Sequence, residues 1–229
     1  MERFVARDNR LFIGIDVGGV KKGFHAVALQ NGVTRVWDNV QGTADSLAHW
    51  CKSLDADVIA IDSPCAWAFG GRSRLCERML VVNDERLSCF ATPDRQRAAG
   101  RKFYDWVRNG EILYHALLRH DYRLYSGQEA CSQNVVFETF PHAVVCALEG
   151  HIIPARQKSL TRRSLLSRLG IDHSVFATID HVDAALCAVA ARSFSYGDYQ
   201  AFGDEMEGFI VVPTPSQQRL QSLHVSSMQ

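Results

Sequence analysis

Carboxylate side chains lie inside segments of this sequence that are otherwise apolar. Five acidic residues share this feature: Asp16, Asp62, Glu138, Asp180 and Asp183. Burying an ionised carboxylate costs free energy unless a cation or a hydrogen-bonding partner compensates its charge. Carboxylate oxygens are hard ligands of the kind that Mg²⁺ and Mn²⁺ prefer. If the fold brings these residues to one place, they predict a site for divalent cations.

Each acidic residue, taken alone, also has a purely structural explanation. Asp180 can cap a helix, with Asp183 favoured by the helix dipole in the first turn. Asp62 precedes Ser-Pro and can be a turn residue at the end of a strand, while Glu138 can be half exposed on an edge strand. Asp16 is harder to explain in this way, because it interrupts an apolar run. The metal interpretation therefore depends on the fold that the rest of the sequence predicts.

The first sixty residues predict four strands and a helix. Apolar segments mark strands at 11–17, 24–30, 33–37 and 58–62, with the turn signal Asn31-Gly32 between the second and the third. A helix capped by Thr43 runs to about Leu54 and is the crossover that lets the fourth strand run parallel to the first. Asp16 and Asp62 are then expected within a few ångströms of each other, at the ends of neighbouring parallel strands.

The remainder predicts a long insertion, one more strand and three helices. The insertion, at about 63–134, lacks strand patterns, is rich in arginine and aromatic residues, and carries one helix near 101–120 that Asn109-Gly110 breaks. The later elements are a strand at 134–140, a short helix opened by Pro141, a basic helix from about Ser159 that Gly170 ends, and a helix at about 180–195.

These elements describe an α/β fold in one domain over residues 11–195, followed by a polar tail at 214–229 that we expect to be flexible. The last helix is rich in alanine, and small side chains let a helix lie close to a sheet. Asp180 and Asp183 are one turn apart on it and share a face. The topology therefore directs all five acidic residues toward one end of the sheet.

Four motifs in this order resemble those of a known superfamily. GIDVGG, IDSP, FETFP and DHVDAAL are similar to the acidic motifs of the RNase H-like nucleases, RuvC-type resolvases especially. Together they resemble one family, catalogued as domain of unknown function 429 and described as predicted nucleases, over about residues 11–195. One departure is Phe24, where the family often has tryptophan. The resemblance implies a mixed five-stranded sheet with three antiparallel strands first, flanked by helices.

The resemblance also implies a metal-dependent nuclease that hydrolyses phosphodiester bonds. Two divalent cations, Mg²⁺ or Mn²⁺, would activate a water and stabilise the attacking and leaving oxygens. Asp16 is expected to bridge them, with Asp62 and Glu138 completing one site and Asp183 the other. Asp180 would assist or cap the helix.

Basic residues gather in two stretches that flank these acids. Residues 70–110 carry nine basic side chains against five acidic ones, interleaved with aromatics, and residues 150–171 carry five basic side chains and no acid. A nucleic-acid partner needs such a surface, on which aromatic side chains stack unpaired bases. The alternative is a solvated helix face and a small aromatic core. The candidate nucleic-acid contacts are Arg72, Arg74, Lys102, Arg162 and Arg163.

The composition excludes several other classes of protein. The 229 residues carry 25 basic and 25 acidic side chains, and their 47% hydrophobic content is typical of a globular domain. Seven cysteines without a CxxC pair fit neither a disulfide framework nor a zinc ribbon, so we expect a cytoplasmic protein. No apolar run is long enough to span a membrane. Nucleophile-elbow, zincin, P-loop and Rossmann motifs are missing from the sequence.

Two other functions remain compatible with these residues. GIDVGG also resembles the first phosphate loop of actin-like sugar kinases, although such kinases duplicate the core and carry a second phosphate loop that this sequence lacks. A non-catalytic module could use the same fold to bind nucleic acid or a protein partner. The sequence does not distinguish DNA from RNA as the substrate, and it does not indicate the oligomeric state.

Overall fold

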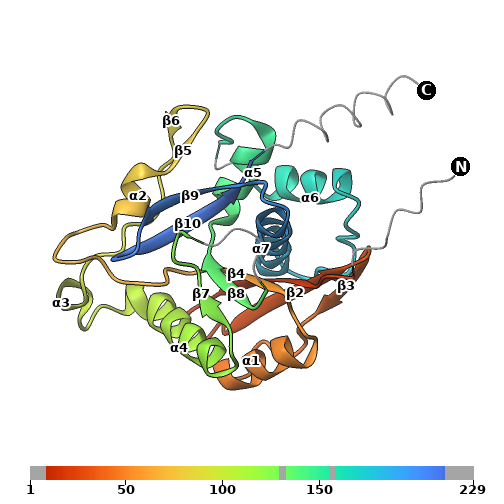
Figure 1. The fold of residues 1–229 in the computed structure, drawn as a ribbon, viewed down its shortest axis with the longest axis horizontal. Coiled ribbons are helices and arrows are strands. Elements are labelled where there is room, and N and C mark those ends of the chain that lie inside the picture. The colour runs from red at the N-terminus through yellow and green to blue at the C-terminus, as the bar shows by residue number, and fades with distance from the viewer. Residues whose placement is uncertain (1–8, 129–132, 155–157, 215–229) are drawn as a thin grey trace, which may run out of the picture.

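A central mixed sheet organises the structure, a computed structural model that describes residues 9–128, 133–154 and 158–214. Its strands follow the order β3-β2-β1-β4-β8-β10-β9, and β7 also pairs with β8 (Figure 1). The strands are β1 (Phe12–Val17), β2 (Phe24–Gln30), β3 (Val33–Val36), β4 (Val58–Asp62), β7 (Arg123–Leu124), β8 (Val135–Glu138), β9 (Tyr199–Asp204) and β10 (Gly208–Pro213).

The expected five-stranded arrangement, with three antiparallel strands first, forms one side of this sheet and is confirmed. β1 pairs antiparallel with β2, and β2 pairs antiparallel with β3. β4 runs parallel to both β1 and β8. Beyond this unit, β10 lies parallel to β8 and forms a hairpin with β9. The sheet therefore continues past residue 195, to Pro213.

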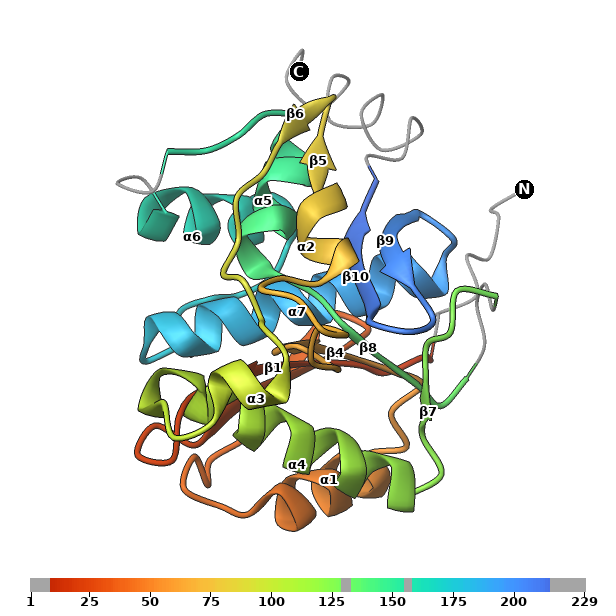
Figure 2. The ribbon, with the colours of Figure 1, turned by 90° about the vertical axis from the view of Figure 1, so that its left-hand side faces the viewer.

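Helices cover both faces of the sheet (Figure 2). The helix α7 (Ile179–Ser195) packs on one face, with α5 (Pro141–Glu149) and α6 (Lys158–Arg168) beside it, and α1 (Ala44–Ser53) and α4 (Asp105–Arg119) pack on the other. Alternate residues of the central strands enter two separate hydrophobic clusters. Val58 and Ala60 belong to the α7 side, whereas Ile59 and Ile61 belong to the α1 side.

A glycine in β1 sets the distance between the sheet and α7. A Cβ atom built on Gly14 would lie 1.9 Å from the carbonyl oxygen of Ala184 and 2.1 Å from the amide nitrogen of Ala188. Only glycine fits there, because any side chain would displace the helix backbone. This close approach places Asp183, the neighbour of Ala184, beside the end of β1.

Local signals explain several helix ends. Thr43 caps α1 by accepting a hydrogen bond from the amide of Ser46, at 3.1 Å. Pro141 is the first residue of α5, and Gly150 ends this helix in the left-handed conformation, with φ of 74°. The expected break at Asn109-Gly110 is wrong, because α4 continues through it. A Cβ on Gly110 would lie 1.9 Å from Ser63 Oγ, so this glycine allows α4 to pack against the end of β4.

The insertion contains more regular structure than its pattern predicts. Besides α4 and β7, it has α2 (Leu75–Met79), α3 (Arg95–Ala98), the 3₁₀ turn η1 (Lys102–Tyr104) and the hairpin strands β5 (Val81–Val82) and β6 (Glu85–Arg86). Strands of two residues are too short to produce an alternating pattern. Apart from Thr214, the tail at 214–229 lies outside the described residues. Within the described residues no helix is long and apolar enough to cross a membrane.

Candidate metal centre

Asp16 and Asp62 meet at the ends of β1 and β4. They are direct partners in the parallel register, so both side chains leave the sheet on the side of α7. The carboxyl group of Asp62 donates a hydrogen bond to that of Asp16. The predicted juxtaposition of these two acids is present in the structure.

The first turn of α7 adds Asp183 and Asp180 to this pair. Burial raises the pKa of Asp16 to about 7, and the charges of Asp183 and Asp180 contribute to the rise. Burial likewise raises the pKa of Asp183 to about 6, and burial and the charge of Asp16 raise the pKa of Asp62 well above its usual value. These raised pKa values mean that the surroundings do not stabilise the ionised carboxylates fully.

Two basic side chains partly balance the four aspartates. Arg162 of α6 pairs with Asp183. Lys22 Nζ lies 3.3 Å from each carboxylate oxygen of Asp180. The side chain of Lys22 is 65% exposed, whereas that of Arg162 is only 9% exposed. We name Asp16, Asp62, Asp180 and Asp183 the aspartate cluster.

A histidine borders the aspartate cluster on the β2 side. His25 is the antiparallel partner of Asp16, so the two side chains lie on the same face of the sheet. Its Nδ1 lies 4.0 Å from Oδ2 of Asp16, and its Nε2 lies 3.9 Å from Oδ2 of Asp180. Burial lowers the pKa of His25, which favours the neutral imidazole. A lone histidine such as His25 is more often structural, and only its position opposite Asp16 across the β1–β2 hairpin indicates a role at this site.

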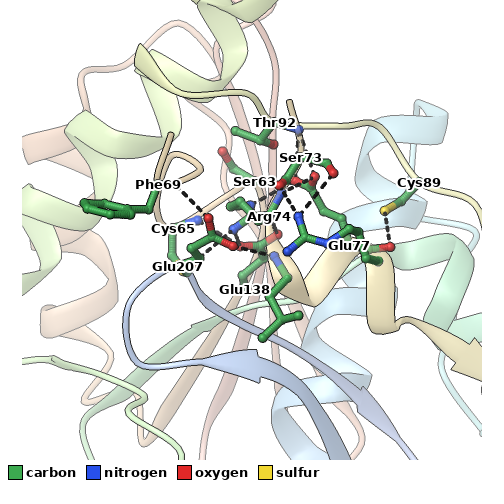
Figure 3. A network of polar contacts seen from close by, with 12 residues as sticks. Ser63, Cys65, Phe69, Ser73, Arg74, Glu77, Cys89, Thr92, Glu138 and Glu207 are labelled. Atoms are coloured by element: carbon green, nitrogen blue, oxygen red, sulfur yellow. Dashed lines mark hydrogen bonds and ion pairs between the residues drawn. The ribbon is translucent and has the colours of Figure 1, made fainter. Parts of the chain in front are cut away.

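Glu138 does not join the aspartate cluster, contrary to the expectation that it completes one metal site. It pairs in register with Ile61 and not with Asp62, so its side chain leaves the opposite face of the sheet. Its oxygens accept hydrogen bonds from Arg74 Nη1 at 2.7 Å and Nη2 at 2.6 Å, and from the amide of Cys65 at 2.9 Å (Figure 3). With only 4% of its surface exposed, Glu138 is already neutralised by an arginine.

Arg74 is the centre of a second buried network, so its expected role as a nucleic-acid contact is not supported. The residue is 1% exposed, and its Nε donates to Glu77 at 2.9 Å. Glu77 also accepts from the amide of Thr92. Glu207, in the β9–β10 turn, accepts from the amides of Phe69 and Leu75. We name Arg74, Glu77, Glu138 and Glu207 the Arg74 cluster; it ties the insertion to the sheet (Figure 3).

The other predicted nucleic-acid contacts differ in their exposure to solvent. Arg72 and Lys102 lie exposed on the insertion. Arg162 is buried against Asp183, so its expected role as a nucleic-acid contact is not supported. Arg163 is partly exposed and donates to the carbonyl oxygens of His173 and Phe176, at 3.3 and 3.4 Å. Counting basic residues in a stretch does not separate side chains that pair internally from those that face solvent.

A cavity of about 360 Å³ opens over the aspartate cluster. Residues of both clusters line it: Asp16, Asp62 and Asp180 of the aspartate cluster, and Arg74, Glu77 and Glu138 of the Arg74 cluster. Phe90 and Trp106 of the insertion line it as well, so the insertion forms part of its wall. The cavity is large enough for a small polar group to approach the carboxylates.

The residues present fit a divalent cation. Asp16, His25 and Asp180 each offer a ligand atom, and these atoms lie within 4.8 Å of one another. Asp62 and Asp183 add oxygen donors beside Asp16, and burial, together with the charges of neighbouring aspartates, raises the pKa values of both. The donor set is mostly carboxylate oxygen, which is the chemistry of Mg²⁺ and Mn²⁺ sites.

A family model and a solved structure are similar to this chain. No curated protein matches this chain. The structure of RuvC from Thermus thermophilus is similar with a TM-score of 0.41 and 15% sequence identity, covering 88% of this chain and 99% of that chain. The family model described as "Protein of unknown function (DUF429)" matches residues 14–208. Because this match spans most of the sequence and all the acidic motifs, the chain belongs to the DUF429 family.

Proposed function

We propose that this protein is a divalent-metal-dependent nuclease that hydrolyses phosphodiester bonds in nucleic acid. The observation that carries the proposal is the convergence of Asp16, Asp62 and Asp183 from β1, β4 and α7, beside a cavity that Asp16 and Asp62 line. Burial and mutual repulsion raise the pKa values of all three, so they favour the arrival of an external cation. Structural carboxylates that are fully paired would not show this pattern.

The residues have distinct roles in this proposal. Asp16 is central, because it shares a hydrogen bond with Asp62 and interacts with the charges of Asp183 and Asp180, and it would be shared by two cations. Such cations, Mg²⁺ or Mn²⁺, activate water and stabilise the charged oxygens of a phosphodiester displacement. Glu138 lines the same cavity, but Arg74 holds its carboxylate, so in this proposal it positions the insertion.

The chain itself supplies groups that can bind and orient a nucleotide. Lys22 lines the cavity and brings a positive charge to the phosphate position beside Asp180. Phe90 and Trp106 offer aromatic surfaces in the same cavity on which an unpaired base can stack. Arg72 and Lys102 are exposed on the insertion and are available for backbone phosphates farther from the site.

The decisive experiment is a cleavage screen with wild type and two variants. Labelled single-stranded, double-stranded, hybrid and branched DNA and RNA are incubated with Mg²⁺ or Mn²⁺, beside an ATP hydrolysis assay. We expect metal-dependent cleavage by wild type and by the exposed control Asp172→Asn, and none by Asp16→Asn. ATP hydrolysis without cleavage would favour a phosphotransferase, and nucleic-acid binding without any turnover would favour a non-catalytic module. Either result would reject the proposal.

A further inference from the structure

The imidazole of His25, beside the aspartate cluster, has a buried nitrogen atom without a hydrogen-bond partner among the described residues. The residue is 6% exposed, and this nitrogen is Nδ1. A buried polar atom that lacks a partner is uncommon and calls for a physical explanation. The ring of His181 packs edge-on against it, with ring centroids 4.9 Å apart and an interplanar angle of 85°. The contact fixes the ring without satisfying the nitrogen.

The ring lies between two carboxylates from different elements. One nitrogen is 4.0 Å from Asp16 of β1, and the other is 3.9 Å from Asp180 of α7. These distances are too long for hydrogen bonds. They leave a space between three potential ligand atoms, no two of which are more than 4.8 Å apart. Small side-chain rotations would bring them to the ligand distances of about 2.0–2.2 Å found around a bound cation.

We propose that His25 is a metal ligand and that, with Asp16 and Asp180, it makes one half of the metal centre selective for Co²⁺ and Zn²⁺ over Mg²⁺. The inference rests on the metal-binding part of the proposed function, because Asp16 belongs to both halves. Imidazole nitrogen binds first-row transition metals well, whereas Mg²⁺ prefers oxygen ligands. The other half, built from Asp62 and Asp183, offers oxygen alone.

Lys22 does not block this subsite. Its ammonium group interacts with both oxygens of Asp180, but its side chain is 65% exposed. A flexible, strongly hydrated ammonium can move into solvent when a divalent cation arrives. Asp180 is not needed to cap α7, because Thr178 caps this helix by accepting a hydrogen bond from the amide of His181. The carboxylate of Asp180 is therefore available as a ligand.

Calorimetry with Co²⁺ and with Mg²⁺ tests the selectivity. The variant His25→Gln replaces the nitrogen by an amide that can offer oxygen. We expect it to bind Co²⁺ at least about tenfold more weakly than wild type, as losses around metal sites typically run 10–100-fold, with a much smaller change for Mg²⁺. The control His142→Gln removes another buried histidine, whose nitrogens contact Cys146, and should change neither affinity. Equal losses for both metals would overturn the proposal.

Pulsed electron paramagnetic resonance of bound Mn²⁺ provides a test that does not depend on the folding of a variant. Wild type should show the nitrogen coupling of a directly bound imidazole, and His25→Gln should lack it. Mn²⁺ bound without nitrogen coupling in wild type would overturn the role of His25 and leave the proposed function intact. Failure of wild type to bind any divalent cation would overturn both.

Discussion

The aspartate cluster and the Arg74 cluster each bury several carboxylates, yet they balance this charge in different ways. In the Arg74 cluster, a guanidinium group and the backbone amides of residues such as Cys65, Phe69 and Thr92 donate to the three glutamates. In the aspartate cluster, no backbone amide of the described residues donates to Asp16, and the pKa of that residue is raised. A buried acid whose charge is compensated by neighbouring groups has a structural role. A buried acid without such compensation can bind an external cation.

The largest effect should come from breaking the compensated cluster. Arg74→Met leaves Glu77 and Glu138 buried without their cation, and removing one partner of a buried ion pair costs about 3–5 kcal/mol. Urea denaturation should show a decrease of this size in the free energy of unfolding. The neighbouring exposed residue gives the control, because Arg72→Met should change stability by less than about 0.5 kcal/mol. A similarly small change for Arg74→Met would mean that its network contributes little.

The metal-free protein should lose stability as pH rises from about 4 to about 7. The folded pKa of Asp16 is about 7 and that of Asp183 about 6, both above the usual aspartate value of 3.8. The folded state therefore holds these protons more tightly, and each unit of pKa difference is worth about 1.4 kcal/mol once both states are ionised. Urea denaturation in chelator across this pH range measures the slope.

His142 changes the pH dependence of stability in the opposite direction, so a variant is needed to isolate the contribution of the aspartates. Burial lowers the pKa of His142 to about 4, which removes stability as pH falls below the usual histidine value. The difference between wild type and Asp16→Asn cancels this contribution. Wild type should lose more stability than the variant as pH rises; parallel curves would contradict the raised pKa of Asp16.

Removing one aspartate should separate metal binding from folding. In chelator, Asp16→Asn should melt at the same temperature as wild type or higher, because it relieves repulsion from Asp180 and Asp183. In Mn²⁺ at 100 times its Kd, wild type should gain about 2.7 kcal/mol and the variant should not. Thermal melting in both conditions measures this. A variant that melts much lower in chelator would show that Asp16 is structural.

The smallest effect concerns the surface of the insertion. Arg72→Glu and Lys102→Glu should weaken nucleic-acid binding, and each lost phosphate contact should reduce the slope of log K against log salt by about one. Binding isotherms at several salt concentrations give these slopes. Arg162→Glu is not an equivalent test, since it would place a second acid against Asp183. Unchanged slopes would place the nucleic-acid surface elsewhere.

The parts of the site that follow from local pattern could be predicted from the sequence. The apolar strands and the crossover helix were sufficient to pair Asp16 with Asp62, and the alanine-rich helix was sufficient to bring Asp183 to them. The face of the sheet on which Glu138 lies could not be predicted. A shift of one residue in strand register moves a side chain to the opposite face, and the local sequence does not determine the register. The burial of Arg74 and Arg162 could not be predicted, because it depends on contacts with residues far away in the chain. The strands β9 and β10 are not among the elements that the sequence predicts, although GFIVVP in β10 is an apolar run.

The position of Glu207 has a consequence for the order in which the chain acquires its structure. Its carboxylate holds the amides of Phe69 and Leu75, which lie 138 and 132 residues earlier. Contacts over such separations form late, because closing a long loop costs conformational entropy before any contact compensates it. During synthesis the ribosome releases Glu207 after all residues of the insertion, so Glu207 cannot bind the insertion until β9 and the turn that follows it have emerged. A nascent chain therefore completes the wall of its cavity only after the aspartates of β1, β4 and α7 have all emerged.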